Sequence, residues 1–557
     1  MTAMAFSPSP RSSLAPSRTT ATTEPEAEQI LRRYRAARNR RSTWENHWQE
    51  CYDFALPHGP GGLRSGTPGE RRLDRLFDGT APDAVDQLAA SLVAQLTPPW
   101  SRWFGLTPGP DLAPEAHSRL APELERAAAV LQTHFDHSNF AIEIHQCFLD
   151  LVTVGTACLL FEETRPGESS AFRFTAVPME DVVMEEGAEG RLDSTFRRSL
   201  LPLAHIQARF PQAELPESMK RAAEQDPDAR FAVVEAVYAD GPVWAWRVLL
   251  DGAATEPRML AQGRFGQSPF INFRWLKAPG EVYGRSPVMK TLPDIKTANK
   301  VVELVLKNAS IAVTGIWQAD DDGVLNPGTI RLVPGTIIPK AVGSAGLTPL
   351  QAPGRFDVSQ LVLEDLRGRI RHALLADRLG PVNDQRMTAT EVLERSAEMG
   401  RLLGATYGRL QSELLTPLLK RAIAILRRRG ELPDLTPDGR VITLQYRSPL
   451  AQAQALQDVQ ALLRWLEVTA SLGPEAQAAI DAPATARWLG EAFGVPATLI
   501  RSPEPEETPE PEPEGLPPPP DAAATDPATT PPDVLINAPS AAMALPAAEG
   551  EEDIIHG

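Results

Sequence analysis

The strongest constraint on this fold is a change of hydrophobic period along the chain. Before about residue 153 and after about residue 294, apolar residues recur with helical spacing, whereas residues 157–275 carry short runs separated by turn residues. The runs with strand character are Ala157–Phe161, Ala171–Val177, Leu192–Ser199, Phe231–Tyr238, Val243–Leu250 and Phe270–Trp275. A strand-rich block between long helical blocks predicts an α+β fold.

Three helices are predicted before the strands. They are Glu26–Ala55, with Trp44, Trp48 and Tyr52 on one core-packing face, then Thr80–Leu96, and a third of about Pro122–Thr153.

The second of these helices lies in the stretch "RLFDGTAPDAVDQLAASLVAQLTPPWSRWFGL". Thr80–Asp83 fits a capping box with a proline in the first turn, an apolar face follows, and Pro98-Pro99 ends the helix. The aromatic residues Trp100, Trp103 and Phe104 come next. We expect these large apolar side chains either to complete the core of the same domain or to contact a neighbouring chain.

Helical patterns return after the strands. The predicted helices are Asp294–Ile311, Val358–Ala376, Thr388–Arg429 and a block over Pro449–Phe493. The long helix Thr388–Arg429 opens with a capping box, is expected to bend at Pro417 and ends at Gly430. Gly315–Gly354 is rich in Gly and Pro with short apolar runs, including Thr329–Val333 and Thr336–Ile338, which predicts a small β insertion.

Most of the negative charge belongs to the C-terminal tail. The 557-residue chain has a formal net charge of −17, and residues 501–557 hold 13 acidic residues, one Arg and 14 of the 53 prolines. Such a composition cannot bury enough apolar surface to fold, so we expect disorder there and a nearly neutral folded body of about three or four domains.

Cysteine usage and hydropathy indicate the compartment. Three widely spaced cysteines (Cys51, Cys147, Cys158) argue against a disulfide framework. The N-terminal residues lack the apolar core of a signal peptide, and the longest apolar stretch, Phe148–Phe161, is too short and too polar to span a bilayer. We therefore expect a soluble intracellular protein with no membrane partner.

Motifs for chemistry are weak. The sequence has no phosphate-binding G-x-x-x-x-G-K-[ST] loop, no H-E-x-x-H, no C-x-x-C and no G-x-S-x-G. The group His134, His137, His145 and Cys147 has partial metal-ligand spacing, but we favour surface roles, and we interpret Asp320–Gly323 as a solvated turn. We expect no catalytic residue, no metal and no cofactor.

Four ordered segments carry a family resemblance. They are "RLFDGTAPDAVDQLAASLVAQLTPPWSRWFGL", "SNFAIEIHQCFLDLVTVGTACLLFEE", "GEVYGRSPVMKTLPDIKTANK" and "MTATEVLERSAEMGRLLGATYGRLQSELLTPLLKRAIAIL". In this order the chain, over roughly residues 25–495, resembles the head-to-tail connector (portal) proteins of short-tailed bacteriophages of the T7 type.

The resemblance implies a layout for the subunit. The parts would be a disordered N-terminus (1–24), an α+β wing (25–284), a first stem helix region (285–313), a clip (314–356), a second stem helix (357–377), a tunnel loop (378–387), a long wing helix (388–430), a helical crown-like region (431–500) and the disordered acidic tail (501–557).

The resemblance also implies partners. A ring of twelve copies would occupy one capsid vertex of the virion, after assembly in the host cytoplasm. It would contact the terminase large subunit, the major capsid and scaffolding proteins and tail or adaptor proteins, with double-stranded DNA passing through it. The alternatives are another virion structural protein, such as a head-completion adaptor or an internal core protein, and an enzyme acting on nucleic acid, which the missing motifs disfavour.

Candidate DNA-channel residues lie near the predicted stem. Lys296, Lys300 and Lys307 fall on one stripe of the first stem helix, with Glu303 in the same sector, and Arg367 and Arg371 are i, i+4 neighbours on the second. Because Lys and Glu are mixed, we favour ion pairs between subunits or solvated roles over contact with phosphates. Arg378 and Arg386, which flank the tunnel loop, are the preferred candidates for contact with DNA.

Overall fold

The computed structural model describes most of the first five hundred residues. The described ranges are 23–57, 75–109, 111–112, 114–252, 255–314, 317–319, 342–343, 347–349, 356–379, 404–435, 438–447, 449–492 and residue 495. By its contacts the chain divides into Met1–Pro503 and Glu504–Gly557, and the second unit lies outside the described residues. The same holds for the predictions on residues 1–22, 320–341, 380–403 and 501–557.

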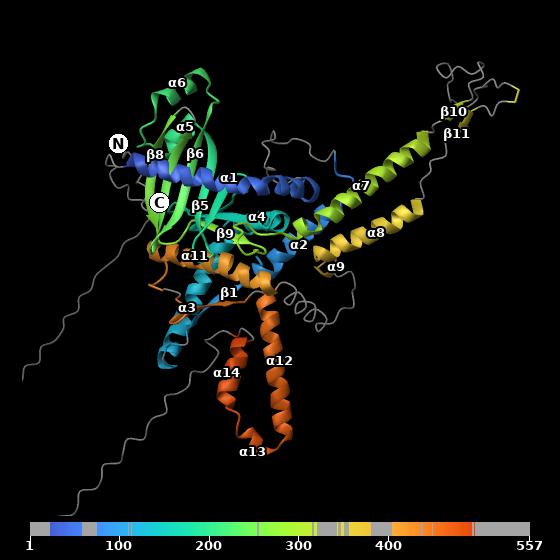
Figure 1. The fold of residues 1–557 in the computed structure, drawn as a ribbon. Coiled ribbons are helices and arrows are strands. Elements are labelled where there is room, and N and C mark those ends of the chain that lie inside the picture. Colours follow the sequence, from blue (N-terminus) through green and yellow to red (C-terminus); the bar gives the residue numbers. More distant parts are fainter. Residues whose placement is uncertain are drawn as a thin grey trace, which may run out of the picture. The chain divides into compact units, whose positions relative to one another are not determined.

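Helices and strands both contribute, which confirms the α+β class (Figure 1). The helices are α1 (Thr23–Ala55), α2 (Thr80–Leu96), α3 (Pro114–Asp136), α4 (Phe140–Val154), α5 (Leu203–Arg209), α6 (Glu217–Gln225), α7 (Pro287–Thr314), α8 (Phe356–Ala373), α9 (Ala376–Leu379), the π-helical turn η2 (Gln411–Leu415), α11 (Thr416–Arg429), α12 (Pro449–Ser471), α13 (Pro474–Gln477) and α14 (Ala482–Ala492).

The strands are β1 (Phe104–Pro108), β2 (Thr156–Glu163), β3 (Phe172–Ala176), β4 (Val182–Glu186), β5 (Leu192–Pro202), β6 (Arg230–Asp240), β7 (Val243–Gly252), β8 (Thr255–Phe265), β9 (Phe270–Arg274), β10 (Trp317–Ala319), β11 (Leu347–Pro349) and β12 (Ile442–Tyr446). The predicted strands are confirmed. The sequence prediction missed the edge strands β4 and β8, of which β8 contains Pro257 and few β-branched residues.

A five-stranded antiparallel sheet of order β4-β5-β6-β7-β8 forms one layer. Helix α1 packs on one face, where Leu31 and Tyr34 are buried with Phe196 and Val234. Neighbouring positions such as Val233 point to the opposite face and join the main core together with residues of α5 and α6. Both faces of the sheet are therefore covered.

A second, three-stranded sheet of order β3-β2-β9 carries an aromatic cluster. Trp103 and Phe104 are buried at 2% and 0% exposure, with ring centroids 4.7 Å apart. They pack against Phe135 and Phe140, whose rings in turn contact Phe174 of β3. Trp103 and Phe104 therefore lie in the core of their own chain, which is one of the two roles expected for the three aromatic residues.

The predicted single helix Pro122–Thr153 is wrong, because two helices occupy this region. Helix α3 begins at Pro114 and contains Pro122. It ends at Asp136, and the next helix, α4, begins at Phe140. The Asn139 side chain pairs with the backbone of Phe174, donating to its carbonyl at 2.8 Å and accepting from its amide at 2.9 Å. Docking of Asn139 on the edge of the sheet accounts for the break.

The predicted bounds of α2 are confirmed, but the capping box is wrong. Gly79 is the N-cap, and the side chain of Asp78 accepts the Thr80 amide at 3.0 Å. The carboxylate of Asp83 instead accepts from the Gln87 side chain at 2.9 Å. The side chain of Asp78, two residues before Thr80, thus satisfies the first free amide of the helix.

Helices α7 and α8 pack against each other as a hairpin, shown yellow-green and yellow in Figure 1. The sequence predicts a helix that starts at Asp294, directly after Pro293. The helix α7 instead begins at Pro287, so Pro293 lies inside it. Helix α8 ends at Ala373, before the predicted Ala376, and Leu375 turns the chain with a left-handed φ of 58°. Of the predicted clip, the described residues include the antiparallel pair β10–β11.

The described part of the predicted long helix starts at residue 404 and contains an irregularity near the expected bend. The π-helical turn η2 immediately precedes Pro417, whose missing amide removes one helical hydrogen bond. The helix ends at Gly430 with a left-handed φ of 75°, as predicted. Within α11, before this end, Arg421 is buried and donates to the carbonyls of Phe161 and Gln267 at 2.8 and 2.7 Å.

The C-terminal helical block is confirmed as α12, α13 and α14, which contact one another. Among the described helices, none combines the length and apolar character needed to cross a membrane. All three cysteines are free and buried, in agreement with the absence of a disulfide framework.

A carboxylate lies in the core between α1 and α4. Asp150 is 6% exposed and accepts a hydrogen bond from the Tyr52 hydroxyl at 2.8 Å. Burial raises the pKa of Asp150 to about 7, against a smaller opposing effect of the Tyr52 hydrogen bond. Between its ordinary pKa and about 7, the folded protein therefore binds a proton that the unfolded chain releases.

We expect the stability of this core to fall as pH rises from about 4 to 7 and to level off above. Asp150→Asn keeps an acceptor for Tyr52 and removes the titration, so it should flatten this dependence and stabilise the protein at pH 8 by up to about 4 kcal/mol. Urea unfolding of both proteins at pH 5 and pH 8, followed by tryptophan fluorescence, measures the change. An identical pH dependence in the two proteins would contradict the assignment.

The aromatic cluster gives a second prediction. Trp103→Ala should lower the free energy of unfolding by about 3–5 kcal/mol, because it leaves a large cavity. Trp100→Ala is the matched control, since Trp100 is 72% exposed and its loss should change stability by no more than about 0.5 kcal/mol. Equal effects of the two substitutions in denaturant titrations would show that Trp103 does not anchor the core.

Candidate functional site

The lysine stripe predicted on the first stem helix exists on α7, and its members are paired within the same chain. Lys300 and Lys307 both contact Glu303, at 3.0 and 2.5 Å. Lys296 contacts Glu50 of α1 at 3.1 Å and lies 5.9 Å from the ring centre of Phe54. All three lysines remain exposed, and the stripe keeps an excess of positive charge because two of them share one carboxylate.

The pKa of the Glu303 carboxyl reflects its contacts with the two lysines. Hydrogen bonds from Lys307 and Lys300 hold the pKa of the Glu303 carboxyl below its usual value, so it stays ionised near neutral pH. These ion pairs form within one chain, and the ion pairs between subunits that the mixed sequence favours stay a prediction.

The two arginines predicted on the second stem helix, which lie on α8, have separate surroundings. Arg367 donates to the nearly buried carboxylate of Asp78 at 2.8 Å, whereas Arg371 is exposed. Burial alone would raise the pKa of Asp78, but hydrogen bonds from Thr80 and Arg367 outweigh it and lower the pKa. Arg367 thus holds the start of α2 against α8.

Sequence reasoning missed a companion residue, Asn299. Its side-chain oxygen accepts from the amides of Phe77 and Asp78 at 2.6 and 3.1 Å, and its nitrogen donates to the carbonyl of Arg75 at 2.9 Å. The segment before α2 is therefore fixed to both α7 and α8. The available signal was a polar residue in line with the apolar positions Ile295 and Val302.

The preferred candidates for contact with DNA are not brought to a site. Arg378 belongs to the short helix α9, but its side chain lies outside the described residues, and so does all of Arg386. Their proposed role stays a prediction.

The three aromatic candidates separate into two environments. Trp103 and Phe104 are buried in the core of their own chain, whereas Trp100, in the turn after Pro98-Pro99, is 72% exposed. Of the three, Trp100 therefore remains available for contact with a neighbouring chain.

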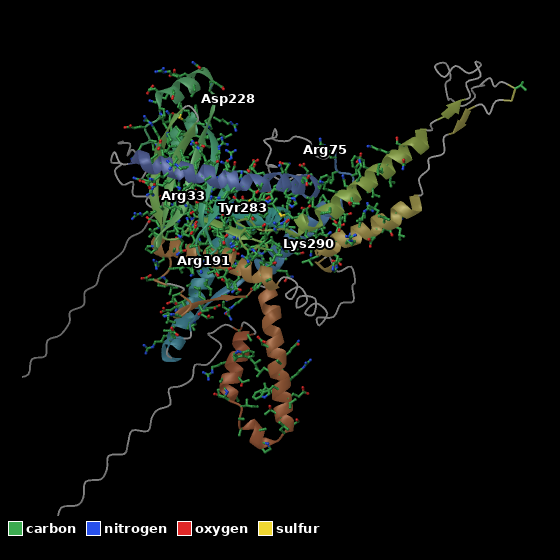
Figure 2. All side chains as sticks on the ribbon, viewed as in Figure 1. Arg33, Arg75, Arg191, Asp228, Tyr283 and Lys290 are labelled. Atoms are coloured by element: carbon green, nitrogen blue, oxygen red, sulfur yellow. The ribbon has the colours of Figure 1, made fainter. Side chains whose placement is uncertain are left out.

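The "YGRSP" segment of the resemblance builds the entrance to α7 (Figure 2, Tyr283 to Lys290). The Tyr283 hydroxyl accepts from the amide of Met184 at 3.2 Å, and Ser286 accepts from the amide of Met289 at 2.9 Å, as a helix cap. A Cβ atom on Gly284 would stand 2.1 Å from the carbonyl oxygen of Gly155. The segment is thus structural, and only glycine fits where the two backbones cross.

The described residues hold no group of three His, Cys, Asp or Glu side chains suited to a metal ion. Of the four residues considered for a metal, His134 is engaged elsewhere: one ring nitrogen lies 2.7 Å from Glu431 and the other accepts the amide of Ala171 at 3.1 Å. Its position is explained by the packing of α3.

Several phage proteins are similar in sequence to this chain over most of its length. The "Probable portal protein" of Bordetella phage BPP-1 is 25% identical over 524 residues, covering 85% of this chain and 89% of its own. The "Portal protein" of Salmonella phage epsilon15 is 24% identical, covering 86% of this chain and 89% of its own. That of Escherichia phage T7 is 21% identical, covering 79% and 82%.

A family model described as bacteriophage head to tail connecting protein matches residues 27–500. This range includes the α2 stretch, the crossing at Gly284, the α7–α8 hairpin and the C-terminal helices. The chain therefore belongs to the bacteriophage head to tail connecting protein family.

Proposed function

We propose that copies of this chain, twelve in number, close into a ring that serves as the portal of a phage head. The ring occupies one vertex of the capsid and provides the channel through which double-stranded DNA enters during packaging and leaves at infection. The observation that carries the proposal is the family match over residues 27–500, together with relatives named portal proteins of which this chain covers nearly nine-tenths.

The parts of the subunit are assigned in chain order. The α+β region through residue 284 is the wing, α7 and α8 are the stem helices, and residues 314–356 are the clip between them. Residues 378–387 form the tunnel loop, 388–430 the long wing helix and 431–500 the crown. The hairpin of α7 and α8 supports the stem assignment, because a helix, a small β-containing insertion and a returning helix follow one another there.

The charge pattern suits a channel through which DNA slides. A protein that neutralises about 6–10 DNA phosphates binds DNA tightly at low salt. A modest rise in salt then lowers its affinity for DNA roughly 10³–10⁵-fold. On α7, Lys300 and Lys307 already form ion pairs with Glu303. The free energy needed to release DNA from them is therefore lower than from a ring of unpaired lysines. This part of the stem therefore suits transient contacts or ion pairs between subunits better than a tight DNA clamp.

The proposal assigns no catalysis to this chain, so the work of packaging belongs to a partner. The terminase large subunit supplies the ATPase and docks on the ring. The major capsid and scaffolding proteins surround the ring during assembly in the host cytoplasm, and tail or adaptor proteins attach to it in the virion.

Electron microscopy of the purified full-length chain tests the ring. We expect annular particles with a central hole and twelvefold rotational symmetry in class averages. A chain that stays monomeric, with or without its scaffolding protein, would overturn the proposal.

The tunnel-loop assignment has its own test. Arg378→Ala together with Arg386→Ala should leave ring assembly intact and reduce DNA packaging or retention, because it removes two candidate phosphate contacts. DNA protected from nuclease in assembled heads is the readout, and Arg264→Ala, at an exposed arginine of the wing sheet, is the matched control. Unchanged packaging in the double variant would remove both residues from the channel.

A further inference from the structure

We propose that the ring is closed at the stem by a charged contact between the α7 helix of one copy and the α8 helix of the next. This inference rests on the proposed function. The two surfaces are the lysine face of α7, formed by Lys300, Leu304 and Lys307, and the acidic face of α8, formed by Leu361, Glu364 and Asp365.

Each face has an exposed leucine near a net charge of one sign, which on α7 remains positive although Glu303 pairs with both lysines. Leu304 is 49% exposed and lies one helical turn from both Lys300 and Lys307. Leu361 is 71% exposed and lies one turn from both Glu364 and Asp365. An apolar centre with a charged margin is the usual composition of a protein contact, and the two margins have opposite sign.

The two faces cannot meet within one chain. At 100° per residue, the lysine face lies roughly opposite the buried positions Ile295 and Ala298 of α7. The acidic face likewise lies on the far side of α8 from Leu366 and Ile370. The faces therefore occupy the outer sides of the hairpin. A ring joins one outer side of each subunit to the other outer side of its neighbour.

The faces also lie at matching heights along the hairpin. Arg369 of α8 contacts Asp294 of α7 at 3.0 Å, which fixes the alignment of the two helices. The helices run in opposite directions, so Leu304 and Leu361 lie ten and eight positions beyond this contact, a difference of about 3 Å in height. A ring axis along the hairpin preserves these heights, so Leu304 of one copy reaches Leu361 of the next.

Charges on both faces are left for such a contact. Lys300 and Lys307 share Glu303, so their side of α7 keeps one positive charge in excess. On α8, Glu364 accepts from the neutral amide of Gln360 at 3.3 Å, and Asp365 is exposed. Gly368 continues this face with open space around it, which lets a neighbouring helix approach closely.

Charge reversal in separate chains tests the contact. Lys300→Glu turns the lysine face, together with Glu303, net negative and so places two acidic faces together in the ring, whereas the double change Glu364→Lys with Asp365→Lys places two basic faces together. Each variant should lower the fraction of chain in rings, measured by mass photometry at low salt, by about tenfold, since a like-charge contact costs at least about 1.4 kcal/mol. An equimolar mixture of the two should restore rings, because alternating copies then present opposite charges at every contact.

Lys290→Glu is the matched control, since Lys290 is an exposed lysine at the other end of the same helix, and it should leave ring formation unchanged (Figure 2). Restoration in the mixture supports a contact between copies. Two variants that assemble normally, or that stay defective when mixed, overturn the inference while wild-type rings still support the portal. If Lys300→Glu rings assemble fully but fail only in DNA packaging, the lysine face serves DNA and the inference is wrong. Wild-type chain that forms no rings instead removes the proposed function itself.

Discussion

The backbone crossing at Gly155 and Gly284 is the constraint on which the rest of the described structure depends. Gly155 has a φ of 79°, and a Cβ atom on either glycine would overlap the other's carbonyl. Around this point the Thr156 hydroxyl accepts the Gly284 amide at 2.8 Å, and Ser286 donates to the carbonyl of Thr153 at the same distance. The end of α4, the start of β2 and the entrance to α7 are thereby fixed together. The direction of the hairpin is thus determined by the core around β2 and the end of α4.

Beyond the crossing, polar contacts add to apolar packing in the first part of the hairpin, where Ile295, Leu366 and Ile370 are buried in the main core. Asn299 and Arg367 bind the backbone and side chain of the segment that precedes α2, and Asp78 is common to both. Further out, the exposed side chains combine charges, such as Lys300 and Glu364, with large apolar groups, namely Leu304, Leu306, Leu361 and Val362. Such a mixed surface has the composition of a protein contact.

The sequence allowed correct prediction of element types wherever the hydrophobic period was long and regular. The bounds of α2, the six predicted strands of the two sheets and the helix end at Gly430 follow from local physics alone. The errors have different causes: β8 has a composition untypical of strands, Asp78 beside α2 replaces the predicted cap, and docking of Asn139 on the distant strand β3 breaks a predicted helix. Site prediction was weaker because it depends on distant partners. Nothing local in the pattern indicates that Trp103 is enclosed whereas Trp100 is exposed, or that Asn299 binds a segment more than two hundred positions earlier.

The pairing of β1 with β12 has a consequence for how the chain is made. Phe104 lies opposite Tyr446, and Pro108 opposite Ile442, so the edge beside the aromatic cluster is completed by residues that leave the ribosome hundreds of positions later. Until then β1 lacks the strand with which it pairs in the folded chain, and an unpaired strand edge can associate with other nascent chains. Competence to assemble would then appear late, when a whole subunit is present.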